Sequence, residues 1–143
     1  VRATGSRLLV EPETKGEDTA IVTLEFKDGA VGSIVVTFAD AATRYRAERR
    51  IVGTEGTLLI RDMPENEWPL VFMHDEAIAP VPVANPITDV AGKALQTTLD
   101  DFLEAITTGG TPPITTEQAR QTLVTIEAAY ESMTGDKRVE VRG

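Results

Sequence analysis

Residues Thr19–Phe38 read TAIVTLEF, KDGA and VGSIVVTF and give the clearest local signal in the sequence. Two runs rich in β-branched residues flank Asp28-Gly29, a pair typical of a two-residue type I′ turn, in which both central residues need a positive φ. The pattern predicts a β-hairpin in which Lys27 pairs with Ala30.

This register assigns each side chain of the hairpin to a face. Phe26, Leu24 and Val22 would lie opposite Val31, Ser33 and Val35. The other face would carry Thr19 as well as Ile21, Thr23, Ile34, Val36 and Phe38. Since both faces are then largely apolar, we expect helices to cover one of them. The second face is predicted to be an interface between copies of the chain, because soluble monomers rarely leave such a patch in water.

A second hairpin is predicted in AERRIVGTEGTLLIRD, where Gly53 and Gly56 frame a tight turn with Thr54 and Glu55 at its tip. The Gly-x-x-Gly pattern does not indicate a phosphate site. It lacks a following Lys-Ser or Lys-Thr, and a strand follows it instead of a helix. We therefore interpret the turn as structural.

After the second hairpin, the sequence predicts one more strand, then a connector, and then helices. WPLVFMHDE predicts one more strand, and AIAPVPVANPITD, with three prolines, predicts an extended connector. A helix is expected from an N-cap at Asp89 to Gly109-Gly110. Its apolar stripe, expected in the core on the face of Val22 and Leu24, is Leu95, Leu99, Phe102, Leu103 and Ile106.

A second helix is predicted from a Thr115-x-x-Gln118 capping box to Gly135. Its expected buried stripe is Ala119, Leu123, Ile126, Tyr130 and Met133, and KRVEVR is expected to close the chain as a strand. The order predicts an α+β fold, an open, mainly antiparallel mixed sheet with two long helices on one face. Residues 1–143 are expected to form one domain.

Composition excludes several classes of function. A net charge of −9 argues against a nucleic-acid partner, whose phosphates would be repelled. The chain has no cysteine for disulfides, thiol catalysis or cysteine-based metal sites, which fits the cytoplasmic location that we expect. No apolar run approaches the roughly 20 residues of a membrane span. The first residue is Val1, which indicates a processed protein or a piece of a longer one.

Candidate catalytic residues are few. His74 stands beside Asp75 and Glu76, but adjacent residues of a strand point apart, so a solvated strand end is favoured over a metal site. Asp100 and Asp101 are consecutive on a helix, and we place them on its exposed face. No catalytic, cofactor or metal residue is predicted.

The best binding candidate is RYRAERR. Arg44, Tyr45, Arg46 and Arg49 could bind a carboxylate, a phosphate or sugar hydroxyls. The alternative is structural: these arginines pair with Glu25, Glu48 and their neighbours along a sheet edge.

Three segments carry a resemblance to a known family. EDTAIVTLEFKDGAVGSIVVTF, RRIVGTEGTLLI and LDDFLEAITTGGTPPITTEQARQTLVTIEAAYESMTGDKRVEV occur in that order between Glu17 and Val141. Together they resemble the C-terminal domain of the Gfo/Idh/MocA oxidoreductases, such as glucose-fructose oxidoreductase and inositol dehydrogenase.

The resemblance implies a two-domain enzyme that uses NAD or NADP. Its Rossmann domain, with a catalytic lysine, and the catalytic acid would lie upstream of Val1. The present chain would wall the pocket for a sugar, cyclitol or related polyol and build a homo-oligomer, without catalysing or binding the cofactor alone. The alternative is a stand-alone, non-enzymatic binding or assembly module with the same fold.

Overall fold

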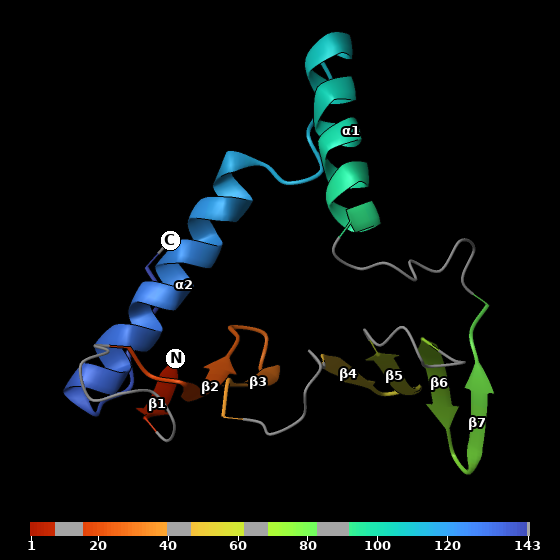
Figure 1. The fold of residues 1–143 in the computed structure, drawn as a ribbon. Helices are drawn as coiled ribbons and strands as arrows, with labels where there is room; N and C mark the ends of the chain where they lie inside the picture. Colours follow the sequence, from red (N-terminus) through yellow and green to blue (C-terminus); the bar gives the residue numbers. More distant parts are fainter. Residues whose placement is uncertain (8–15, 40–46, 62–68, 83–91, 143) are drawn as a thin grey trace. The chain divides into compact units, whose positions relative to one another are not determined.

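The structure is a computed structural model that describes residues 1–7, 16–39, 47–61, 69–82 and 92–142 (Figure 1). The chain forms two compact units. The first is Val1–Ala41 with Ile114–Gly143, and the second is Ala42–Pro113.

The first unit contains a three-stranded antiparallel sheet in the order β1-β2-β3. Its strands are β1 (Arg2–Ser6), β2 (Thr19–Glu25) and β3 (Val31–Thr37).

The turn between β2 and β3 has three residues, not the expected two. The Phe26 N–H donates to the Ala30 carbonyl at 2.9 Å, and the Gly29 N–H donates to the Phe26 carbonyl at 3.1 Å. Gly29 takes a φ of 91°, and the Asp28 carboxylate accepts from the Ala30 N–H at 3.1 Å. Only one residue of the turn is left-handed, which is the pattern of a three-residue hairpin loop.

The extra turn residue shifts the predicted register by one, so the predicted pairs are wrong. Val22 pairs with Ile34, and Ile21 pairs with Val35. Because the side-chain period of a strand is two, the shift moves all of β3 to the opposite face relative to β2. Ile34 and Val36 therefore share a face with Val22, and do not share one with Ile21.

Helix α2 (Thr116–Gly135) packs on β1 in this unit. The predicted capping box is present: the Gln118 N–H donates to the Thr115 hydroxyl at 3.2 Å, and the Thr115 N–H donates to the Gln118 side chain at 2.9 Å. The helix ends at Gly135 as expected, and Asp136, with a φ of 45°, caps it.

The predicted buried stripe of α2 is wrong in most of its members. Leu123, Ile126 and Tyr130 are exposed, and the buried face consists of Ala128, Ala129 and Ser132. Small side chains let the helix approach β1, where Val1 and Ala3 complete the cluster. Partly buried apolar side chains pack around it: Val22, Leu24, Met133, Val139 and Val141.

The second unit contains a four-stranded antiparallel sheet in the order β4-β5-β6-β7. Its strands are β4 (Glu48–Gly53), β5 (Gly56–Arg61), β6 (Leu70–His74) and β7 (Ala77–Pro80). The predicted β4–β5 hairpin is confirmed, with Gly53 paired to Gly56.

Two details of this sheet go beyond the sequence pattern. Gly56 has a φ of 147°, and a Cβ on it would lie 2.6 Å from the Met73 carbonyl oxygen, so the turn requires glycine there. Residues 77–80, expected in a connector, form edge strand β7. Pro80 is tolerated in β7 because an edge strand has one side without a partner strand.

Helix α1 (Gly92–Thr108) also belongs to the second unit. The Gly110 N–H donates to the Ala105 carbonyl at 2.9 Å, and Gly109 takes a φ of 69°, a Schellman ending that confirms the predicted stop. The expected N-cap, Asp89, lies outside the described residues. The stripe Leu95, Leu99, Phe102, Leu103 and Ile106 is 48% to 62% exposed, so its assignment to the core is wrong.

Residues 137–142, expected as a strand, are not one, although they lie extended beside α2. Val139 exchanges two backbone hydrogen bonds with Val1, of 2.7 and 2.9 Å. The strands and helices confirm the α+β class. Neither described helix is long and apolar enough to cross a membrane.

Candidate functional site

The arginine-rich candidate is described only in part. Arg44, Tyr45 and Arg46 lie outside the described residues, and Arg49 is an exposed residue of β4. Arg49 pairs with Ile60 of β5, which places both on the face of the sheet that also carries Ile51 and Leu58. A guanidinium on an apolar sheet face can hold an anion or a hydroxyl pair.

The alternative for the arginines predicted that Glu25 and Glu48 are their partners. Instead, Glu25 lies 2.8 Å from the Arg138 guanidinium, and Glu48 lies 3.5 Å from that of Arg61. Glu25 and Glu48 thus each pair with an arginine outside the stretch RYRAERR.

His74 is held at the end of β6. Its Nδ1 lies 2.7 Å from the Glu55 carbonyl oxygen at the tip of the β4–β5 turn, and its Nε2 lies 3.3 Å from the Asp75 carboxylate. Within the described ranges, no three His, Asp or Glu side chains group in a way that could hold a metal ion. The ring links the strand end to the neighbouring turn.

The five residues expected at an interface do not share one face. Ile21 and Thr23 lie on one face of the three-stranded sheet, with Val31 and Val35, while Ile34 and Val36 lie on the face of Val22. Phe38 follows the end of β3 and is 82% exposed. The corrected face with Ile21 still has exposed apolar residues, since Ile21, Val31 and Val35 are 51% to 71% exposed.

Ser132 is the residue that sequence reasoning missed. Its side chain is fully buried, accepts from the Ala3 N–H at 2.9 Å and donates to the Lys137 carbonyl at 2.6 Å. The hydroxyl thus joins α2, β1 and the C-terminal segment, residues 137–142. The spacing of the small residues Ala128, Ala129 and Ser132 on one helix face was the available signal.

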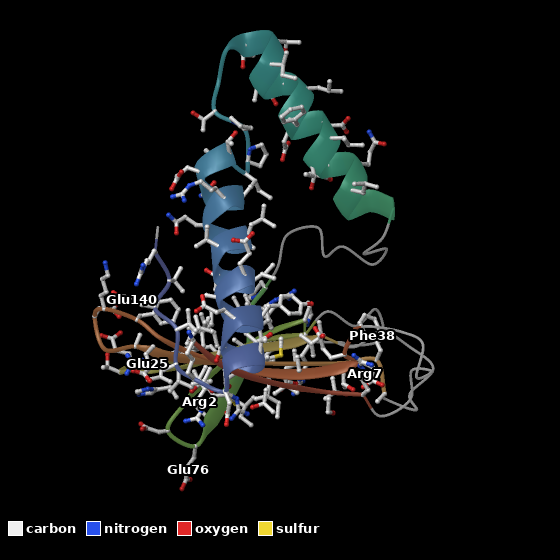
Figure 2. The ribbon with its side chains drawn as sticks, turned by 90° about the vertical axis from the view of Figure 1, so that its left-hand side faces the viewer. Arg2, Arg7, Glu25, Phe38, Glu76 and Glu140 are labelled. Atoms are coloured by element: carbon white, nitrogen blue, oxygen red, sulfur yellow. The ribbon has the colours of Figure 1, made fainter. Side chains whose placement is uncertain are left out.

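Ionic contacts surround the end of this helix. The Lys137 ammonium lies 2.9 Å from the Glu131 carboxylate and lowers its pKa. A hydrogen bond to the Glu17 side chain raises the pKa of the Tyr130 phenol, and the negative charge of Glu17 raises it further. In Figure 2 the labelled Arg2 marks β1 and the labelled Glu140 marks the C-terminal segment, the two segments that lie beside the C-terminal half of α2.

Solved structures show the same fold. Levoglucosan dehydrogenase in complex with NADH and L-sorbose is 20% identical, with a TM-score of 0.82 over 99% of this chain and 44% of its own. An oxidoreductase domain protein from Kribbella flavida is 18% identical, with a TM-score of 0.81 over 99% and 44%. An oxidoreductase from Agrobacterium radiobacter, in complex with NAD+, L-tartaric acid and magnesium, is 20% identical, with a TM-score of 0.72 over 97% and 42%.

The chain thus spans less than half the length of each of these proteins. A search of curated proteins found no match. The model of the oxidoreductase family, C-terminal alpha/beta domain, matches residues 1–141. The chain therefore belongs to the Gfo/Idh/MocA oxidoreductase family and corresponds to its C-terminal domain.

Proposed function

We propose that residues 1–143 form the single C-terminal domain of a longer NAD- or NADP-dependent oxidoreductase that acts on sugars, cyclitols or related polyols. The family match over residues 1–141 carries this proposal. The names of two neighbours agree with it, since one is a complex with NADH and L-sorbose and another with NAD+ and L-tartaric acid.

The cofactor and the catalytic lysine would belong to an upstream Rossmann domain. The sequence contains no Gly-x-Gly-x-x-Gly between a strand and a helix, which is the usual site for the pyrophosphate of a dinucleotide. Calorimetry of this chain with NAD and NADP is expected to show no binding up to millimolar concentration. A micromolar dissociation constant would contradict the assignment.

The arginine-rich stretch is the proposed wall of the substrate pocket. Arg49→Ala in the parent enzyme should raise KM for a polyol or lower kcat while leaving the melting temperature unchanged. Arg61→Ala is the matched control. It removes an arginine of the same sheet that already has an ion-pair partner, Glu48 on the neighbouring strand. A variant of Arg49 that melts early but keeps its kinetics would assign the residue a structural role.

The second proposed role is assembly into a homo-oligomer through the sheet face of Ile21 and Val35. The two faces of the sheet can be tested separately, because the side chains of Ile34 and Val35, neighbours on β3, point to opposite sides. Val35→Asp should shift sedimentation toward the monomer, whereas Ile34→Asp should leave the assembly intact. A wild-type monomer at about 100 μM would refute this role, since a standard interface of about 800 Å² per partner persists there.

A non-enzymatic module with this fold is the competing candidate. The sequence of the parent gene upstream of Val1 distinguishes the two candidates. A reading frame for a Rossmann domain there supports the oxidoreductase. A start codon just before Val1 supports the module.

A further inference from the structure

The C-terminal segment, residues 137–142, begins a strand pairing that the chain does not continue. The Val1 amine donates to the Val139 carbonyl at 2.7 Å, and the Val139 N–H donates to the Val1 carbonyl at 2.9 Å. A two-way exchange between the same two residues is the hydrogen-bonded pair of an antiparallel ladder. In such a ladder, the residues opposite Glu140 and Val141 are those that precede Val1.

The side chains of the segment also alternate as they do in a strand. Val139 and Val141 are half-buried and pack against the core, whereas Glu140 and Arg142 are exposed. The alternation continues beyond the single paired residue. The segment is therefore arranged as an edge strand whose partner is incomplete.

The direction of β1 shows where that partner would run. The Ala3 N–H donates to the Ser132 hydroxyl at 2.9 Å, whereas Val1 pairs with Val139, which lines a pocket together with Val124 and Ala128 of the preceding turns of α2. Residue numbers thus increase in the same direction along β1 and α2. A backward extension of β1 would pass from Ala128 toward Val124.

A groove lies at this place. It has a volume of about 380 Å³ and runs between α2 and the C-terminal segment. Its apolar lining consists of Val124, Ala128 and Val139, and charged side chains of both signs surround them. Val139, one of the three apolar lining residues, is the residue that pairs with Val1, so the groove continues the line of β1.

We propose that this groove binds the residues that precede Val1 in the parent protein, which extend β1 and convert residues 139–142 into a paired edge strand. The first upstream residue would lie opposite Glu140 and the second opposite Val141. Since Val1 and Ala3 point into the core, the second upstream residue does so too, and it must be apolar. The neighbouring structures are more than twice as long as this chain, and a parent protein of similar length would provide residues upstream of Val1 to fill the groove.

The inference depends on the proposed function only in requiring an upstream part, and its test involves neither cofactor nor activity. Three chains are compared by amide hydrogen exchange: the 143-residue chain and two extended forms. One carries the natural upstream residues, about six of them or roughly 20 Å of strand, and the other a Gly-Ser extension of equal length.

The Val141 N–H faces the added strand, and the Glu140 N–H faces away, which provides an internal control. The Val141 amide should exchange at least about tenfold more slowly with the natural extension than with Gly-Ser, because the new hydrogen bond must open first. The Glu140 amide should change little. Equal exchange of Val141 in the two extended chains would overturn the proposal.

Val124→Asp in the naturally extended chain should abolish the protection of Val141, and Glu127→Gln, on the same groove, should retain it. Retained protection in the Val124 variant would contradict the role of the groove. Should that variant fail to fold, the parent gene still decides: a charged second upstream residue overturns the proposal, and an apolar one supports it.

Discussion

The two helices of this chain show opposite relations between apolar surface and burial. Helix α1 has a stripe of large apolar side chains, and the stripe is about half exposed or more. Helix α2 buries two alanines and a serine against β1. A helix that lies close to a strand therefore needs small side chains and a hydrogen-bonded hydroxyl at the contact, and large apolar side chains do not by themselves ensure burial.

The largest expected effect comes from the serine of α2. Ser132→Ala removes the acceptor of the Ala3 N–H and the donor to the Lys137 carbonyl. Leaving these two groups unpaired should lower the free energy of unfolding by about 2–4 kcal/mol. Ser33→Ala, on the exposed surface of β3, should change it by less than about 0.5 kcal/mol. Urea unfolding of both variants measures the difference, and equal midpoints would contradict the role of Ser132.

A smaller effect is expected from the stripe of α1. Phe102 is 48% exposed, so Phe102→Ala should cost at most about 1.5 kcal/mol, compared with about 3–5 kcal/mol for a buried phenylalanine. Asp100→Ala on the same helix is the control, expected within about 0.5 kcal/mol. Thermal melting of the isolated chain provides the measurement. A loss of 3 kcal/mol or more would show that the stripe is buried in solution.

The N-terminal cap of α2 should contribute a comparable or smaller amount. Thr115→Ala removes the acceptor of the Gln118 N–H and should cost about 1 kcal/mol. Thr122→Ala lies within the same helix, where alanine is the better helix former, and should not destabilise the chain. Circular dichroism during thermal unfolding compares the two, and equal losses would mean that the cap contributes nothing specific.

The smallest effect is a pH dependence in the first turns of α2. Hydrogen bonds from Arg120 and Gln121 lower the pKa of the exposed Glu117 carboxyl from 4.5 to about 2. Because the pKa is lower in the folded state, the stabilisation is complete above about pH 4.5 and disappears as the pH falls toward 2. Glu117→Gln should flatten this part of the stability curve. An unchanged slope in that variant would exclude Glu117 as its source.

The two hairpins show how far the sequence predicts this fold. Both turns were placed correctly, because glycine with a neighbouring polar residue marks a reversal of the chain. The register of the first was wrong, since Asp-Gly also fits a three-residue loop in which only Gly29 is left-handed. A single residue in a turn decides the face of each side chain, and local propensity does not determine it.

Three of the four candidate binding residues lie outside the described residues, and the contacts of α2 were predictable only in part. The capping box of α2 follows from two residues in sequence, and it is present. The role of Ser132 depends on Ala3 and Lys137, and the contact with Ala3 spans 129 residues of sequence. Such contacts arise from tertiary packing, which periodicity does not encode.

The β4–β5 turn has a consequence for variation in this sequence. A Cβ at Gly56 would lie 2.6 Å from a backbone oxygen and 2.7 Å from the Phe72 ring, whereas a Cβ at Gly53 would meet its nearest atom at 3.6 Å. In a saturation library, position 56 should therefore retain glycine almost exclusively, while position 53 should drift to other small residues. Of the two glycines in the Gly-Thr-Glu-Gly signature, the second is the more informative marker of distant relatives.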